Sequence, residues 1–149
     1  MKTLCHLAFI AIASCLAFVS CSKNNDDNTS GTITVNGVTY TNVKATCEVR
    51  AGVFFNFDLG DGITATGLVD YGLAFDKTLH FGYDEDNGGY GDWLPLEVDY
   101  PNGEHYTAMP KSGTQTMKEN EGTISVVIDG KDENNKDYKV NVVAKVTVH

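Results

Sequence analysis

The sequence predicts an all-β domain, an antiparallel β-sandwich of the immunoglobulin-like kind. Apolar and polar residues alternate along much of the chain, and no long segment shows the apolar period of an amphipathic helix. Turn residues separate at least eight such runs, which is typical of a sandwich or a barrel. Because the expected strands vary in length, we favour the sandwich. A small closed barrel of the lipocalin-like kind is the alternative.

The first predicted hairpin lies at the start of this domain. Residues 33–35 and 38–40 flank Asn36-Gly37, a dipeptide that accepts positive φ angles and closes two-residue hairpins. In the next expected strand, residues 43–50, the odd positions are apolar, so Cys47 should face the core. A reactive thiol would need exposure and a lowered pKa. We therefore expect Cys47 to be a buried packing residue.

Four more runs predict paired strands. Residues 53–59 and 63–69 alternate on either side of a glycine-rich turn. Near the C-terminus, apolar residues occupy alternate positions in residues 124–128 and again in residues 137–149. The last two runs should form an antiparallel hairpin, with residues 129–136 as a polar, solvated loop between them.

The beginning of the chain has the pattern of an export signal. Lys2 precedes an apolar stretch over residues 4–19, and the small Ser20 stands just before Cys21. This pattern resembles the lipobox of bacterial lipoproteins, which implies that Cys21 carries lipid and becomes the first mature residue. A second box ends at Cys15, but apolar residues follow it directly. A plain secretory signal and an uncleaved membrane anchor are the other interpretations.

Three segments follow from this interpretation: a signal peptide over residues 1–20, a lipidated Cys21 with a polar tether to residue 31, and a β domain over residues 32–149. The tether is rich in Asn and Asp and too poor in apolar residues to fold. The chain has 11 Lys plus Arg and 20 Asp plus Glu, and the signal removes only Lys2, so the mature formal charge is −10. Such an acidic chain is not expected to bind nucleic acid, and lipid on Cys21 should provide its membrane attachment.

Two short patterns resemble lipoproteins of Bacteroidota. Lys23 followed by Asp26 and Asp27, close to Cys21, looks like the surface-export signal of that phylum. The run over residues 112–116, followed by residues 122–126, is similar to the last hairpin of many small β domains from the same group. The resemblance implies a lipid anchor in the outer membrane, with the domain on the cell surface. It implies no active-site residue.

Residues 83–110 are expected to be irregular and to hold a binding site, because loops on a rigid scaffold often carry function. Asp84, Asp86 and Asp92 can be placed at alternating positions of a calcium loop around turning glycines. Two further positions of that loop lack a side-chain oxygen. We therefore favour an acidic turn between strands, and a calcium site is the alternative.

Four aromatic residues of the same region are candidates for ligand binding: Tyr90, Trp93, Tyr100 and Tyr106. Exposed rings beside polar groups suit the faces and hydroxyls of sugars, and they also suit protein partners. Trp93 can equally be a core residue, because Leu94, Pro95 and Leu96 follow it.

The sequence has none of the common nucleophile, zinc-helix, phosphate-loop or dinucleotide motifs. We therefore expect no catalytic residue, no enzyme activity and no cofactor, with calcium as the one candidate. The predicted function is a lipid-anchored binding or accessory protein of the cell envelope, with a glycan or a partner protein as ligand. The alternative is a structural subunit of a fimbrial or envelope assembly that pairs through an edge strand. A free edge at the last strand would favour the alternative.

Overall fold

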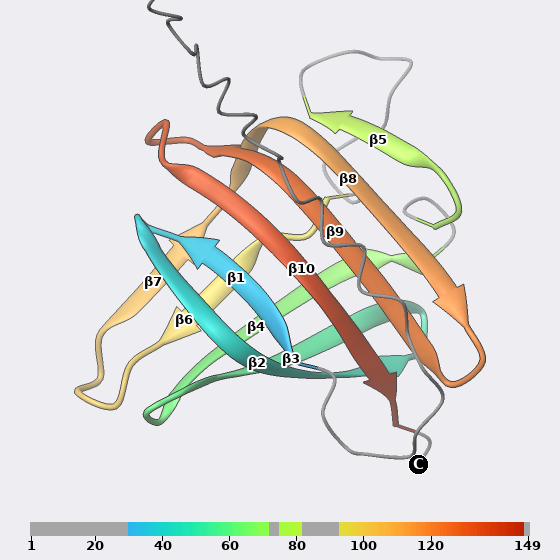
Figure 1. Ribbon diagram of the computed structural model, residues 1–149, viewed down its shortest axis with the longest axis horizontal. Coiled ribbons are helices and arrows are strands. Elements are labelled where there is room, and N and C mark those ends of the chain that lie inside the picture. Colours follow the sequence, from blue (N-terminus) through green and yellow to red (C-terminus); the bar gives the residue numbers. More distant parts are fainter. Residues whose placement is uncertain (1–29, 72–74, 82–92, 148–149) are drawn as a thin grey trace, which may run out of the picture.

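The computed structural model describes residues 30–71, 75–81 and 93–147, and this part of the chain consists of strands and turns (Figure 1). Its strands form one mostly antiparallel sheet in the order β5-β8-β9-β10-β1-β2-β3-β4-β6-β7. The all-β prediction is confirmed. The sheet is not closed into a barrel, because β5 and β7 lie at its two ends. The strands are β1 (Gly31–Val35), β2 (Val38–Val49), β3 (Gly52–Gly60), β4 (Ile63–Asp70), β5 (Thr78–Phe81), β6 (Leu96–Asp99), β7 (His105–Ala108), β8 (Pro110–Asn120), β9 (Thr123–Asp132) and β10 (Asp137–Val146).

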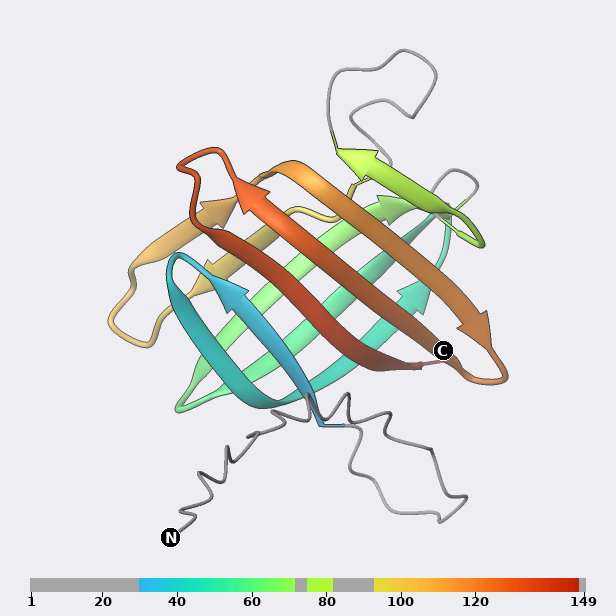
Figure 2. The same cartoon turned by 45° about the horizontal axis from the view of Figure 1, so that its top comes forward.

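The sheet folds over into two layers whose strands cross steeply (Figures 1 and 2). The front layer contains β1, β10, β9 and β8, and the back layer contains β3, β4, β6 and β7. Strand β2 belongs to both, because its first half pairs with β1 and residues 44–49 pair with β3. Asn42, between these halves, has a positive φ of 59°. The resulting sandwich-like core lies between the layers.

The first predicted hairpin is confirmed. Val35 pairs with Val38 across the turn, and both turn residues have positive φ, 53° at Asn36 and 77° at Gly37. The sheet begins at Gly31, one residue before the predicted start of the domain. The predicted signal and nearly all of the tether lie outside the described residues.

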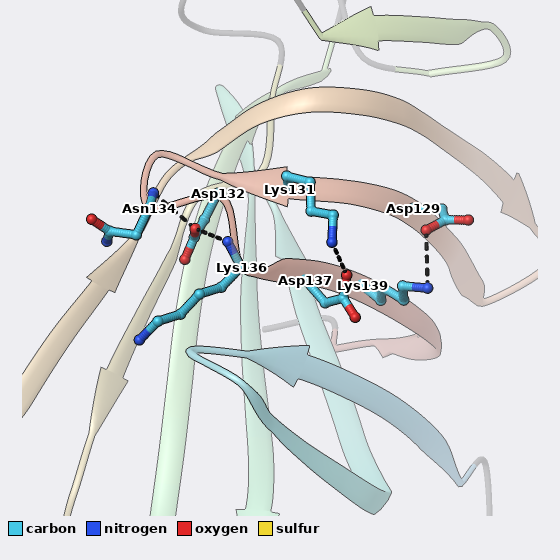
Figure 3. A network of polar contacts seen from close by, with 7 residues as sticks. All are labelled: Asp129, Lys131, Asp132, Asn134, Lys136, Asp137 and Lys139. Atoms are coloured by element: carbon cyan, nitrogen blue, oxygen red, sulfur yellow. Dashed lines mark hydrogen bonds and ion pairs between the residues drawn. The ribbon is translucent and has the colours of Figure 1, made fainter.

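The C-terminal hairpin is confirmed, but the predicted loop over residues 129–136 is wrong in its extent. Strand β9 continues to Asp132, so the turn contains only residues 133–136. Asp132 is buried, with 1% of its surface exposed. One of its carboxylate oxygens accepts hydrogen bonds of 2.9 Å from the backbone N–H groups of Asn134 and Lys136 (Figure 3). The buried carboxylate holds the turn and supports the longer strand.

Opposite charges also support the longer β9 on its outer side. Asp129 stands across from Lys139, with 3.4 Å between Oδ1 and Nζ, and Lys131 stands across from Asp137 and donates a hydrogen bond to it (Figure 3). That hydrogen bond and the charge of Lys131 lower the pKa of Asp137. Opposite charges that face one another stabilise neighbouring strands. Polar residues at these positions therefore extend the hairpin instead of forming a loop.

The core is built from the inward positions that the alternation predicts. Cys47 is fully buried, and burial, followed by the charge of Glu119, raises the pKa of its thiol to about 11. A buried thiol of raised pKa is a packing group. Phe55 and Phe57 stack with ring centres 5.9 Å apart. The largest fully buried side chains also include Ile33, Val35, Val43, Val53, Leu94, Leu96, Met117, Ile124 and Tyr138.

Leu94 ties the back layer to the front layer. Its backbone N–H donates a 2.9 Å hydrogen bond to Oε1 of Gln115 on β8, and its carbonyl accepts a 2.6 Å bond from the hydroxyl of Tyr138 on β10. Its side chain fills the space above Gly67 on β4, where a β-carbon would come within 2.5 Å of Leu94 Cδ1. We call Leu94, Gln115 and Tyr138 the Leu94 bridge. All three are fully buried, so the core contains polar groups that are paired with one another.

The expectation that residues 83–110 are irregular is wrong for the described part of that region. Strands β6 and β7 form a hairpin there, closed by hydrogen bonds from Tyr100 N–H to the Glu104 carbonyl and from Gly103 N–H to the Tyr100 carbonyl. Each strand has only four residues, which is too short for the alternation to stand out. The hairpin extends the back layer at its edge.

The last strand is not an edge strand. β10 lies between β9 and β1, and its final residues also pair in parallel with β2. The described ends of the sheet are β5 and β7 instead.

Candidate functional site

The outward side chains of β2, β3, β4, β6 and β7 form a continuous surface, which we call the β3–β4 face. Its centre is a polar row whose members are cross-strand partners of one another, one on each strand. Adjacent strands are about 4.8 Å apart, so the row offers evenly spaced hydrogen-bonding groups. The polar row consists of Thr46, Asn56, Thr66, Glu97 and Thr107.

A second row runs parallel to the first and is richer in charge. Its members are exposed cross-strand partners, and His105 connects the two rows. The Nδ1 atom of His105 lies 2.8 Å from Oδ1 of Asp99, and its Nε2 lies 3.2 Å from the Thr107 hydroxyl. The second row consists of Lys44, Asp58, Thr64, Asp99 and His105.

Two large apolar side chains stand on the other side of the polar row. Phe54 on β3 and Leu68 on β4 are cross-strand partners, and they are 43% and 47% exposed. They line a hollow of about 1040 Å³ on the β3–β4 face. A hollow with apolar walls and a few polar side chains is the usual form of a small-ligand site. The hollow is lined by Arg50, Ala51, Gly52, Phe54, Phe55, Asn56, Thr66, Gly67, Leu68, Val69, Asp70, Pro95 and Glu97.

The rim of the hollow is acidic overall. Arg50 forms an ion pair of 2.7 Å with Glu48, the neighbour of Phe54 on β2, so its positive charge is balanced. Asp70 and Glu97 add two carboxylates to the lining. The site therefore combines a small apolar platform with hydrogen-bonding groups and an excess of negative charge.

The prediction from sequence did not include Phe54 or Leu68, although the sequence contains a signal for both. Phe54 and Leu68 occupy positions that the alternation assigns to the solvent side of their strands. A large apolar residue at an outward position departs from the apolar and polar alternation of a half-buried strand. Attention to such departures would have pointed to the β3–β4 face.

Two predicted ligand-binding residues, Tyr100 and Tyr106, lie near one another but pack against the core. The Tyr100 hydroxyl is 3.4 Å from that of Tyr40, and the Tyr106 hydroxyl donates a 3.0 Å hydrogen bond to the buried Asp132. Burial, followed by the hydrogen bond to Tyr100, raises the pKa of Tyr40 to about 12. Burial and the bond to Asp132 raise the pKa of Tyr106 as well. These hydroxyls serve contacts within the protein.

The structure separates Trp93 from these two tyrosines. Trp93 precedes β6 by three residues, whereas Tyr100 directly follows its other end. Trp93 is half-buried and packs against the core. It is therefore neither a fully buried core residue nor a fully exposed ligand-binding residue. The described aromatic candidates do not form one platform.

The other predicted site residues, Tyr90, the calcium candidates Asp84, Asp86 and Asp92, and the lipidation site Cys21, lie outside the described residues. In the parts of the chain that the structure describes, no group of three or more His, Cys, Asp or Glu side chains is arranged to hold a metal ion.

A search of the same described parts finds no helix with the length and apolar character that a membrane span needs. Comparison with protein-family models, curated proteins and solved structures gives no match to this chain.

Proposed function

We propose that this chain is a non-catalytic, lipid-anchored accessory protein of the cell envelope, and that it binds a glycan on the β3–β4 face. The observation that carries this proposal is the hollow, in which Phe54 and Leu68 stand half-exposed beside hydrogen-bonding side chains. Sugars present apolar ring faces and many hydroxyls. A site for them needs apolar surface and polar groups at close range.

The side chains of the hollow supply both kinds of contact. Phe54 and Leu68 offer neighbouring apolar surfaces, and Asn56, Thr66 and Glu97 offer donors and acceptors directly beside them. Their strands lie within a paired sheet, so the backbone beneath these groups is rigid. A site built on strands needs little reorganisation when a ligand binds.

The anchor in this proposal is supported by the sequence alone. The apolar stretch, the small Ser20 and the polar residues after Cys21 favour lipid attachment at that cysteine. A short polar tether would keep the domain close to the membrane surface. Changing Cys21 to Ala should move the protein from the membrane fraction to the soluble fraction on cell fractionation. Unchanged membrane retention of the C21A variant would contradict the anchor.

The place of β10 supports ligand binding over assembly through the last strand. An interior strand has neighbours on both sides, so its backbone groups are not available to another chain. Assembly by strand pairing would have to use another edge of the sheet.

The binding proposal is tested by replacing both apolar side chains. The variant with Phe54→Ala and Leu68→Ala should bind at least tenfold more weakly to any glycan that binds the unaltered chain, as measured by isothermal titration calorimetry. Its thermal unfolding midpoint should change little, because both side chains are half-exposed. Unchanged glycan affinity in a folded double variant would exclude this site.

A further inference from the structure

We infer that the ligand is a glycan chain without acidic groups, and that it lies across the strands along the polar row. This inference rests on the proposed function and specifies the ligand class and its direction. It depends on the register of five strands, on the acidic charge around the row and on the small size of the apolar surface.

The register favours a ligand that crosses the strands. Each member of the polar row is the cross-strand partner of the next, from Thr46 on β2 to Thr107 on β7. Five strands at a spacing of about 4.8 Å give a row of roughly 19 Å, and this spacing is close to the repeat of pyranose rings in an extended glycan. A chain of about four rings can therefore meet a polar side chain at each ring.

A ligand that follows the strands would meet a different surface. Along β3, Phe54 and Asn56 are followed by Asp58, and along β4, Leu68 and Thr66 are followed by Thr64. The apolar platform and the polar row are each only one side chain wide in this direction. The second row lies four residues from the platform on each strand. A chain along the strands would thus leave the platform and reach the charged second row within about 14 Å.

The charges of the face determine the ligand class. Glu97 lies in the polar row, Asp70 lines the hollow, and Asp58 and Asp99 stand in the second row. Glu97 and Asp99 are two residues apart on β6, about 7 Å, which is within the Debye length of about 8 Å in physiological salt. The cations of the described face, Lys44 and Arg50, each stand beside a carboxylate, so they leave the face acidic overall. Lys44 is opposite Asp58, and Arg50 pairs with Glu48. The whole chain carries a formal charge of −9 at pH 7. Uronate or sulfate groups on a ligand would be repelled, so the fitting chain is one without them.

The apolar surface is too small for a stable protein partner. A typical interface buries about 800 Å² on each partner and has an apolar core. Phe54 and Leu68 are the two large hydrophobic side chains exposed on the described β3–β4 face, and each is already half-buried. For a glycan, in contrast, an apolar surface of this size is sufficient, because it has to lie beneath only one sugar ring.

The test measures binding of the purified full chain to polysaccharides by affinity gel electrophoresis and calorimetry. The neutral set contains β-1,3-glucan, starch, xyloglucan and mannan, and the acidic set contains homogalacturonan and alginate. At least one neutral polysaccharide should bind, and neither acidic one should. A ligand at a hundred times its dissociation constant should raise the unfolding midpoint by about 8 °C.

Single substitutions test the direction of the chain. Asn56→Ala and Thr107→Ala each remove one hydrogen-bonding group from the polar row and should weaken binding about fivefold. Asn56 also lies on the path of a chain that follows β3, so Thr107, at the β7 end of the row, decides the direction. Asn141→Ala and Thr32→Ala are the matched controls, because they change the same residue types at exposed positions on the front layer. These controls should leave the affinity unchanged. Glu97→Gln should reduce the discrimination against homogalacturonan.

The outcomes separate this inference from the proposed function. If a neutral glycan binds, the Phe54 and Leu68 double variant loses this binding and T107A keeps the full affinity, the proposed site stands and the direction is wrong. Binding of the acidic set alone would overturn the ligand class. Absence of binding across both sets would overturn the inference and the proposed function together.

Discussion

The Leu94 bridge and the hollow of the β3–β4 face depart from the ordinary distribution of residues in opposite ways. The bridge places polar groups in the core, where Gln115 and Tyr138 are fully buried. The hollow places apolar groups in solvent, where Phe54 and Leu68 are about half-exposed. In the bridge, each departure is explained by a hydrogen bond to the backbone of Leu94. In the hollow, Phe54 and Leu68 are cross-strand partners and Leu68 covers Gly52, and these contacts still leave nearly half of each side chain exposed.

This difference shows how structural and functional departures can be distinguished. A buried polar group that is fully hydrogen-bonded costs little and gives the core a unique arrangement. An exposed apolar pair adds little to the stability of the fold and leaves apolar surface available to a ligand. The bridge contributes to the stability of the protein, whereas the proposed function assigns the hollow to ligand binding.

The largest expected effect is the difference in the free energy of unfolding between Phe55→Ala and Phe54→Ala, the same substitution at two adjacent positions. Phe55→Ala should lower the free energy of unfolding by about 3–5 kcal/mol, because Phe55 is 1% exposed and stacks on Phe57. Phe54→Ala should cost less than about 1 kcal/mol, because this ring is on the outer side. Urea unfolding of both variants measures the two values. Similar losses at both positions would remove the distinction between the core and the hollow.

The bridge is tested next by Gln115→Leu, which keeps the approximate volume of the side chain. The N–H of Leu94 would lose its buried acceptor, so the free energy of unfolding should fall by about 1–3 kcal/mol. Thr114→Ala, at the neighbouring position of β8, is the control and should change stability by less than about 0.5 kcal/mol. A Q115L variant as stable as the unaltered chain would mean that the bond contributes nothing.

A smaller effect is expected for Tyr138→Phe. This change removes only the hydroxyl that donates to the Leu94 carbonyl, so the loss should be about 1 kcal/mol. Because both bonds hold the same peptide, the loss in a Q115L background should be smaller than in the unaltered chain. A double-mutant cycle in urea measures this coupling. Strictly additive losses would show that the two bonds act independently.

The smallest expected effect is a pH dependence at the tyrosine cluster. The pKa of Tyr40 is raised from 10.0 to about 12, so the unfolded chain loses this proton at lower pH than the folded protein does. The stability from Tyr40 is therefore complete below pH 10 and is lost as the pH rises through about 12. Tyr40→Phe should flatten the decline between these values, as measured by urea unfolding at a series of pH values. An unchanged slope would assign the decline to other groups.

The alternation of the sequence was sufficient to predict the class of the fold. The tight turn at Asn36-Gly37, the inward side of Cys47 and the apolar face of the last strand are all local properties, and all are confirmed. The sequence could not locate β6 and β7, because four residues carry too little periodicity. It also could not show that residues 129–132 continue a strand, since their support comes from partners on β10.

The sequence by itself determined an all-β domain with its inward and outward positions, because a period of two depends only on neighbouring residues. Only the tertiary structure decided that β10 is interior, that Leu94 joins the layers, and that the polar row spans five strands. Each of these depends on the register between segments far apart in the chain. The residues of one strand do not specify which strand pairs with it, so the polar row could be recognised only once the register of the sheet was known.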